Sequence, residues 1–130
     1  MVFELNRFIK FGVVGGSGVV VNLGLLWVFT EIFGFFYIYS AVISIETSII
    51  SNFVLNEHWT FKDRRQDGAG MFRRGIKFNL VSLAGMVINL AVLFSLTEFI
   101  SLYYMYSEVI GIIAAFLWNY FINLIWTWKV

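Results

Sequence analysis

Four long apolar runs, separated by short polar segments, dominate the chain. They cover roughly residues 8–30, 39–59, 76–97 and 106–126, and charged residues gather at their ends rather than inside them. A helix needs about 20 mainly apolar residues to cross roughly 30 Å of hydrocarbon. Each run therefore predicts one transmembrane helix, and the fold class is all-α integral membrane.

The two halves of the chain repeat each other. Shifting the sequence by 67 residues aligns it with itself without a gap, and 23 of 57 aligned positions are identical. The shared residues include Arg, Asn, Glu and Trp, which chance matching between apolar runs does not produce. The pattern indicates a single domain, 1–130, made of two tandem helical hairpins: repeat one covers about 7–63 and repeat two about 74–130. Two spans per repeat make the copies parallel, with a pseudo-twofold axis along the membrane normal.

Basic residues lie on one side of this arrangement. Eight of the nine occur near the termini or in the loop of about residues 62–74, and Lys77 follows that loop directly. None occurs in the connections at 31–38 and 98–105. The positive-inside rule then places both termini and the 62–74 loop in the cytoplasm. We expect a multi-pass protein of the cell membrane.

Composition strengthens the membrane assignment. Apolar residues make up 60% of the chain and charged residues 13%, whereas soluble domains are about 25% charged. The chain has no cysteine, so no disulfide framework is expected.

Three of the polar residues inside the apolar runs form a candidate polar path: Asn22, Glu46 and Asn89. Asn22 and Asn89 occupy equivalent depths in the two repeats, whereas the equivalent of Glu46 is Ile113. A polar group in hydrocarbon needs a partner, so hydrogen bonds between helices are one interpretation of the asparagines. The other is a pathway for a polar ligand, and an intramembrane carboxylate favours a functional role.

The predicted cytoplasmic ends combine amides, cations and aromatic rings in both repeats. Tryptophan and lysine are typical of membrane interfaces, so anchoring alone is one interpretation. Anchoring leaves the paired asparagines without a role, and amides beside cations suit a lipid phosphate. The candidate phosphate ligands are Arg7, Lys10, Asn52, Asn56, Lys62, Arg74, Lys77, Asn119, Asn123 and Lys129.

The sequence offers no pattern of enzymatic chemistry. It contains no cluster spaced as metal ligands, no nucleophile paired with a base and no phosphate-binding loop in a suitable context. We therefore expect that the protein is not an enzyme, that it holds no metal or other cofactor, and that it binds no nucleic acid.

Several of these positions together resemble the GtrA-like family. The pattern consists of Arg7-Phe8-x-Lys10-Phe11-x-x-Val14-Gly15, the midspan Asn22, and Asn52-Phe53-x-x-Asn56-x-x-Trp59-Thr60-Phe61. The resemblance covers essentially the whole chain. It implies work with polyprenyl phosphate or polyprenyl-phosphate-linked sugars in the synthesis of cell-surface polysaccharide or glycoprotein.

Two functions agree with this resemblance. In the first, the protein translocates a polyprenyl-phosphate-linked sugar across the membrane; four helices enclose little space, so we expect a homo-oligomer. In the second, it is a non-catalytic membrane anchor and oligomerisation subunit, and a family-2-type glycosyltransferase docks on its basic loop. A third interpretation, a small multidrug exporter, ranks last because the first span carries Asn22 and no glutamate. Membrane lipids surround the chain in every case.

Overall fold

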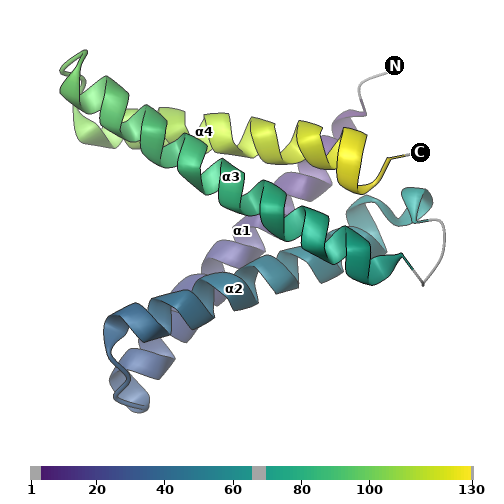
Figure 1. Ribbon diagram of the computed structural model, residues 1–130, viewed down its shortest axis with the longest axis horizontal. Coiled ribbons are helices and arrows are strands. Elements are labelled where there is room, and N and C mark those ends of the chain that lie inside the picture. The colour runs from purple at the N-terminus through teal and green to yellow at the C-terminus, as the bar shows by residue number, and fades with distance from the viewer. Residues whose placement is uncertain (1–3, 66–69, 130) are drawn as a thin grey trace. The chain divides into compact units, whose positions relative to one another are not determined.

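The computed structural model describes residues 4–65 and 70–129, and the long elements among them are helices. The chain divides into two compact units, Met1–Gln66 and Asp67–Val130. Each unit is a helical hairpin, shown in Figure 1. The prediction of an all-α fold with four transmembrane helices is confirmed, while the pseudo-twofold axis stays a prediction.

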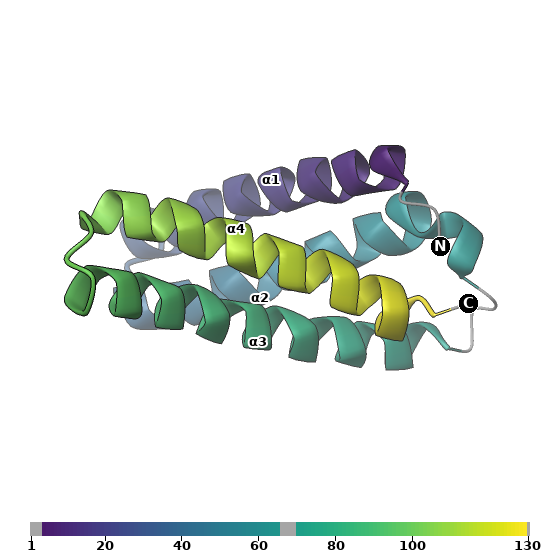
Figure 2. The same cartoon turned by 90° about the horizontal axis from the view of Figure 1, so that it is seen from above.

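The first hairpin pairs α1 with α2. Helix α1 (Leu5–Trp27) continues through a π-helical turn, η1 (Val28–Ile32), and α2 (Tyr37–Leu55) continues through a second one, η2 (Asn56–Thr60). A short 3₁₀ turn, η3 (Lys62–Arg64), follows. Figure 2 shows the two helices running back along each other from the connection near residue 34.

The second hairpin pairs α3 with α4. Helix α3 (Met71–Glu98) is continuous, and α4 (Tyr104–Ile122) ends in a π-helical turn, η4 (Asn123–Thr127). Helix α3 begins inside the segment predicted as the 62–74 loop. Residues 66–69 of that loop lie outside the described part of the chain, as does Val130 at the end of repeat two.

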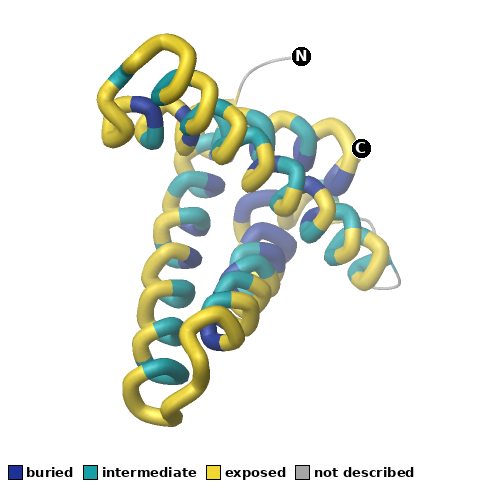
Figure 3. Tube along the Cα trace, turned by 60° about the vertical axis from the view of Figure 1, so that its left-hand side comes forward, coloured by how far each residue is buried: buried dark blue, intermediate teal, exposed yellow. Residues whose placement is uncertain are grey.

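The helices extend beyond the apolar runs at both ends. The four spans are Leu5–Ile32, Tyr37–Thr60, Met71–Glu98 and Tyr104–Thr127, and each is long and apolar enough to cross a membrane. Charged and aromatic residues at the ends continue the helix, because the backbone must satisfy its own hydrogen bonds close to hydrocarbon. Exposed residues run along the helices, as Figure 3 shows, and many of them are large and apolar. Lipid is the solvent that suits such a surface.

Small residues let the two helices of each hairpin approach closely. Gly18 in α1 faces Asn52 in α2 so closely that an added Cβ would overlap the amide group. The buried Ser48 hydroxyl donates a hydrogen bond of 2.7 Å to the carbonyl oxygen of Gly18. Gly85 and Asn119 make the same close approach in the second hairpin. Close backbone contact through small residues is how helices associate where no hydrophobic effect drives them together.

The two hairpin connections also correspond. Each contains one residue with left-handed backbone, Gly34 at φ 72° and Ser101 at φ 62°, and these positions lie 67 residues apart. The Phe35 amide bonds to the Phe29 carbonyl at 2.9 Å in the first connection, and an equivalent bond of 3.0 Å closes the second. These matching contacts support the proposed duplication.

The close contact between Gly18 and Asn52 predicts an energetic coupling. We expect Gly18→Ala to weaken the fold by about 1 kcal/mol more in the natural protein than in the Asn52→Ala background. The physical reason is that the new methyl group displaces the amide only when the amide is present. Denaturant unfolding of the four variants in detergent micelles measures the coupling.

The matched control is Gly16→Ala in the same helix. A Cβ at Gly16 meets nothing within 4 Å, so this change should be neutral or slightly stabilising because alanine favours helix. Equal effects of Gly18→Ala with and without Asn52 would contradict the proposed contact.

Candidate functional site

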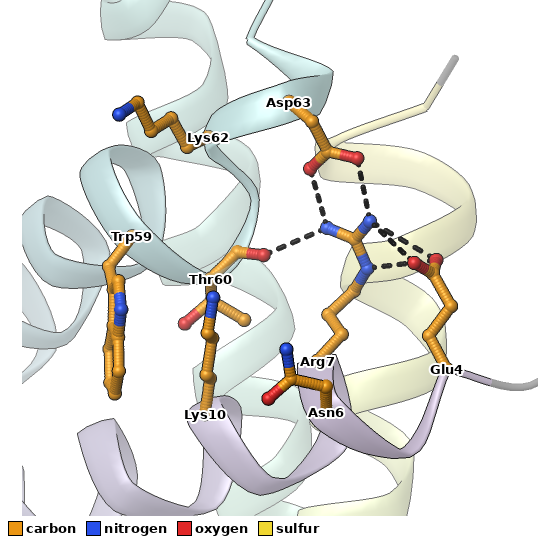
Figure 4. A pocket seen from close by; sticks show the side chains of 8 residues that line it. All are labelled: Glu4, Asn6, Arg7, Lys10, Trp59, Thr60, Lys62 and Asp63. Carbon is orange, nitrogen blue, oxygen red and sulfur yellow. Dashed lines mark hydrogen bonds and ion pairs between the residues drawn. The ribbon is translucent and has the colours of Figure 1, made fainter.

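A pocket lies at the end of the first hairpin where α1 begins and α2 gives way to η2 and η3; this end is called the basic end below. The pocket has a volume of about 490 Å³. Its lining residues are shown in Figure 4 and comprise Glu4, Asn6, Arg7, Lys10, Trp59, Thr60, Lys62 and Asp63. Three candidate phosphate ligands, Arg7, Lys10 and Lys62, therefore line one pocket. The candidates Asn52 and Asn56 are not among its lining residues.

Arg7 is buried and its guanidinium is held on several sides. Nη1 and Nη2 donate to the two carboxylate oxygens of Asp63 at 2.9 and 2.8 Å. Nε and Nη2 donate to Glu4, and Nη1 also donates 2.8 Å to the carbonyl oxygen of Thr60. Paired, parallel hydrogen bonds between arginine and a carboxylate are strong and geometrically specific. Arg7 therefore ties the start of α1 to the segment that follows α2.

This pairing changes the acidity of Asp63. The hydrogen bonds from Arg7 hold the pKa of Asp63 below its usual range, and the positive charge of Arg7 acts in the same direction against the opposing effect of partial burial. Asp63 is thus ionised at every physiological pH. Its carboxylate, with that of Glu4, offsets the charge of Arg7.

Aromatic rings complete the basic end. Phe61 is fully buried, packs edge-on against Phe11 at 6.2 Å between ring centroids, and lies 5.3 Å from the guanidinium carbon of Arg7. The Lys10 ammonium lies 5.4 Å from the ring centre of Trp59. Such cation–π contacts hold a cation in place without neutralising it.

The second asparagine of each repeat marks the start of a π-helical turn. η2 begins at Asn56 and η4 at Asn123, and the carbonyl oxygens of these residues accept hydrogen bonds from the amides of Phe61 and Trp128. The Asn123 side chain also donates 2.7 Å to the Asn119 carbonyl and accepts 2.6 Å from the Thr127 hydroxyl. In the second hairpin the four-residue spacing from asparagine to threonine thus lets the two side chains bond to each other at the helix end. Membrane anchoring alone does not explain that spacing.

The remaining candidates of the second hairpin lie near η4 and the start of α3. Lys77 stands 5.3 Å from the ring centre of Trp126, as Lys10 does from Trp59. Arg74 lies in the first turn of α3 and is half-buried, and Lys129 is exposed just after η4.

The midspan candidates do not gather at one site. Asn89 packs against Gly111 of the neighbouring helix, and its buried amide oxygen has no hydrogen-bond partner within the described residues. Asn22 is half-buried in α1, and Glu46 is exposed on the surface of α2. Their shared role in a polar path stays a prediction.

Sequence reasoning missed the two carboxylates of the pocket, Glu4 and Asp63. The sequence does place these acidic residues close to two of the candidate ligands: Glu4 lies near Arg7, and Asp63 lies beside Lys62. The repeat concealed it, because the equivalent positions in the second copy are Met71 and Val130.

Residues 10–128 match the family described as the GtrA/DPMS transmembrane domain. That match covers almost the whole chain. The chain belongs to this family. The resemblance predicted from the Arg-Phe-x-Lys-Phe and Asn-Phe-x-x-Asn patterns is therefore confirmed, and so is a multi-pass membrane protein.

This GtrA/DPMS domain is also similar to a dolichol-phosphate mannosyltransferase of Pyrococcus furiosus. The two are 38% identical over 125 residues, which is 96% of this chain and 34% of the relative. The chain thus spans about a third of the length of the relative. The relative is an enzyme by its name, so the prediction that the protein is not an enzyme was wrong. The physical reason is that the match covers only 34% of the relative, and the catalytic groups of that enzyme need not lie in the matched part.

The pairing between Arg7 and Asp63 predicts the effect of Asp63→Asn. We expect a loss of about 1 kcal/mol in unfolding free energy at neutral pH, because the 65% exposed carboxylate is screened by water and Glu4 stays in place. The pKa of Asp63 is lowered by folding, so its contribution is complete above the usual aspartate pKa and disappears as the pH falls through the lowered value. Thermal unfolding from pH 7 down to pH 3 measures both effects.

Glu31→Gln is the control, since it removes an equal charge from an exposed position at the opposite end of the same hairpin. It should leave the unfolding temperature nearly unchanged. A difference between the natural protein and Asp63→Asn that grows toward acid pH would contradict the pairing.

Proposed function

We propose that this chain is the membrane domain of a system that transfers a sugar to a polyprenyl phosphate. The support is the match to the GtrA/DPMS transmembrane domain over residues 10–128, together with the 38% identity to a dolichol-phosphate mannosyltransferase. The domain would hold the acceptor lipid at the bilayer, with its phosphate at the ends of the helices where cations gather. A family-2-type glycosyltransferase, in the same chain or as a partner, would supply the sugar-transfer chemistry.

The location of the cations supports this role. Lys10 and Lys77 each lie over a tryptophan, Trp59 and Trp126, at the end of a spanning helix. Tryptophan prefers the depth of the lipid headgroups, which is also the depth of a polyprenyl phosphate group. By the positive-inside rule this end faces the cytoplasm, where sugar nucleotides are available to a transferase.

A chimera tests the proposal. This chain would replace the matching 125-residue segment of the Pyrococcus enzyme, and mannose transfer to dolichol phosphate would be measured in reconstituted membranes. We expect the chimera to retain transfer within about tenfold of the natural enzyme, which corresponds to roughly 1.4 kcal/mol.

The control chimera carries an unrelated four-helix membrane segment of the same length. It should anchor the enzyme but transfer much less mannose, because it lacks the residues proposed to hold the lipid. Equal transfer by both chimeras would show that any anchor suffices, and no transfer by the first would refute the proposal.

Translocation of a polyprenyl-phosphate-linked sugar is the second candidate function. Glu46 favours it, because this acidic side chain is exposed on a spanning helix, and ionisable residues within spans mark substrate and ion pathways. A homo-oligomer would be needed to surround the sugar, and Asn22 and Asn89 would add amides to its path.

Vesicles with a fluorescent polyprenyl-phosphate sugar test this second function. Addition of a membrane-impermeant quencher reports how quickly the lipid reaches the outer leaflet. We expect faster exchange with the natural chain than with Glu46→Leu, while Glu31→Gln, at the hairpin connection, should behave as the natural protein. Exchange no faster than in protein-free vesicles would exclude translocation by this chain alone.

A further inference from the structure

The three cations of the pocket at the basic end differ in how their charge is used. Arg7 faces two carboxylates and a backbone carbonyl, and all three of its nitrogen atoms donate hydrogen bonds. Within the described residues, Lys10 and Lys62 have no carboxylate within 4.0 Å. The unbalanced positive charge of the pocket therefore belongs to the two lysines.

Figure 4 shows the same separation in space. Arg7, Glu4 and Asp63 form one cluster joined by dashed lines, whereas no dashed line reaches Lys10 or Lys62. An anion that reached Arg7 would have to displace Asp63 from two hydrogen bonds of 2.8 and 2.9 Å. Beside Lys10 and Lys62 an anion would have no paired carboxylate of the described residues to displace.

We propose that Lys10 and Lys62 bind a phosphomonoester in this pocket, and that Arg7 is a positioning residue that does not touch the phosphate. This assignment rests on the proposed function: the two lysines of the first hairpin would bind the phosphate of the acceptor lipid.

Charge and shape both select this ligand class. A phosphomonoester carries close to two negative charges at neutral pH, with a second pKa of about 6, and so matches two ammonium groups better than a singly charged diester does. The pocket volume of about 490 Å³ falls within the range of roughly 300–1,000 Å³ usual for small-molecule sites, so it admits more than a bare phosphate ion. Trp59, which is 45% exposed, offers an apolar wall beside the charge.

Arg7 contributes by fixing the geometry of the pocket. Arg7 lies in the first turn of α1, about one turn before Lys10. It bonds to Thr60 and Asp63, which stand on either side of Lys62 in the sequence. Without this tie, the two segments that carry the lysines of the pocket would no longer be joined by Arg7. Arg7 thus acts on phosphate binding through Lys10 and Lys62.

Binding to the full chain in nanodiscs of neutral lipid tests the assignment. The probes are a short-chain polyprenyl phosphate, the matching polyprenol, a phosphodiester lipid (phosphatidylglycerol) and the soluble monoester glycerol 3-phosphate. Native mass spectrometry gives the bound fraction of each lipid, and calorimetry gives the affinity for the soluble monoester. We expect Lys10→Gln and Lys62→Gln each to weaken polyprenyl phosphate binding about tenfold, without changing the unfolding temperature.

Two further variants distinguish residues that contact the phosphate from a residue that only positions the lysines. Arg65→Gln removes an exposed cation that contacts His58 and does not line the pocket, so it should leave binding within about twofold of the natural protein. Arg7→Lys keeps the charge and loses the paired hydrogen bonds, so it should lower the unfolding temperature as well as the affinity. In the natural protein, affinity should rise as the pH increases from 5 to 7, while the second phosphate proton is lost.

The outcomes decide between sources of the phosphate. Tight binding of polyprenyl phosphate with weak binding of glycerol 3-phosphate assigns the site to the lipid; comparable binding of both assigns it to the phosphomonoester group alone. Natural affinity in Lys10→Gln and Lys62→Gln, or an equal loss in Arg65→Gln, overturns the proposal. Transfer by the chimera together with unaffected lysine variants would refute this site while the proposed function stands.

Discussion

Hydrocarbon offers no hydrogen bonds, and this constraint shapes every part of the two hairpins. It forces the chain into helices, and it requires polar side chains within the spans to find partners on the same or the neighbouring helix. Ser44 donates to the carbonyl of Ser40 at 2.6 Å in its own helix, and Ser48 donates across to Gly18. In the second hairpin the Trp118 ring nitrogen donates 3.1 Å to the Val81 carbonyl. Ser48 and Trp118 therefore join the two helices of their hairpins, whereas Ser44 bonds within its own helix.

The same constraint explains the π-helical turns η2 and η4, which follow α2 and α4. A wider turn lets one carbonyl oxygen, that of Asn56 or Asn123, accept the amide five residues later and so ends the span with that group satisfied. It also turns Phe61 and Trp128 inward, where each is fully buried against a phenylalanine of the neighbouring helix. π-Helical turns often occur at functional sites, because they redirect side chains without breaking the helix. Here they leave Trp59 and Trp126 beside the lysines.

The two copies share this framework but differ in charge. In the first copy Arg7 meets Glu4 and Asp63, and the sequence has Met71 and Val130 at the equivalent positions of the second. The packing residues at the ends of the two hairpins correspond, whereas the polar residues there differ. Both carboxylates line the pocket at the basic end of the first hairpin. A pair of carboxylates has converted one of the shared cations into a structural residue.

The sequence by itself determined the four spans, the duplicated pattern and the family. Each depends on a periodic or local property: the length of an apolar run, the recurrence of Asn, Trp and Lys every 67 residues, or a short motif. These properties can be recognised without knowing which side chains contact each other in the folded protein.

Only the tertiary structure decided what the polar residues do. Arg7, Lys10 and Lys62 look alike in sequence, yet Arg7 is paired with Asp63, which lies 56 residues away along the chain. Neither lysine is paired with a carboxylate of the described residues. Asn52 was predicted as a phosphate ligand, and the structure places it against Gly18 and outside the pocket. The reason is physical: the charge available to a ligand depends on neighbours in space, and helix packing brings together neighbours that no local pattern in the sequence records.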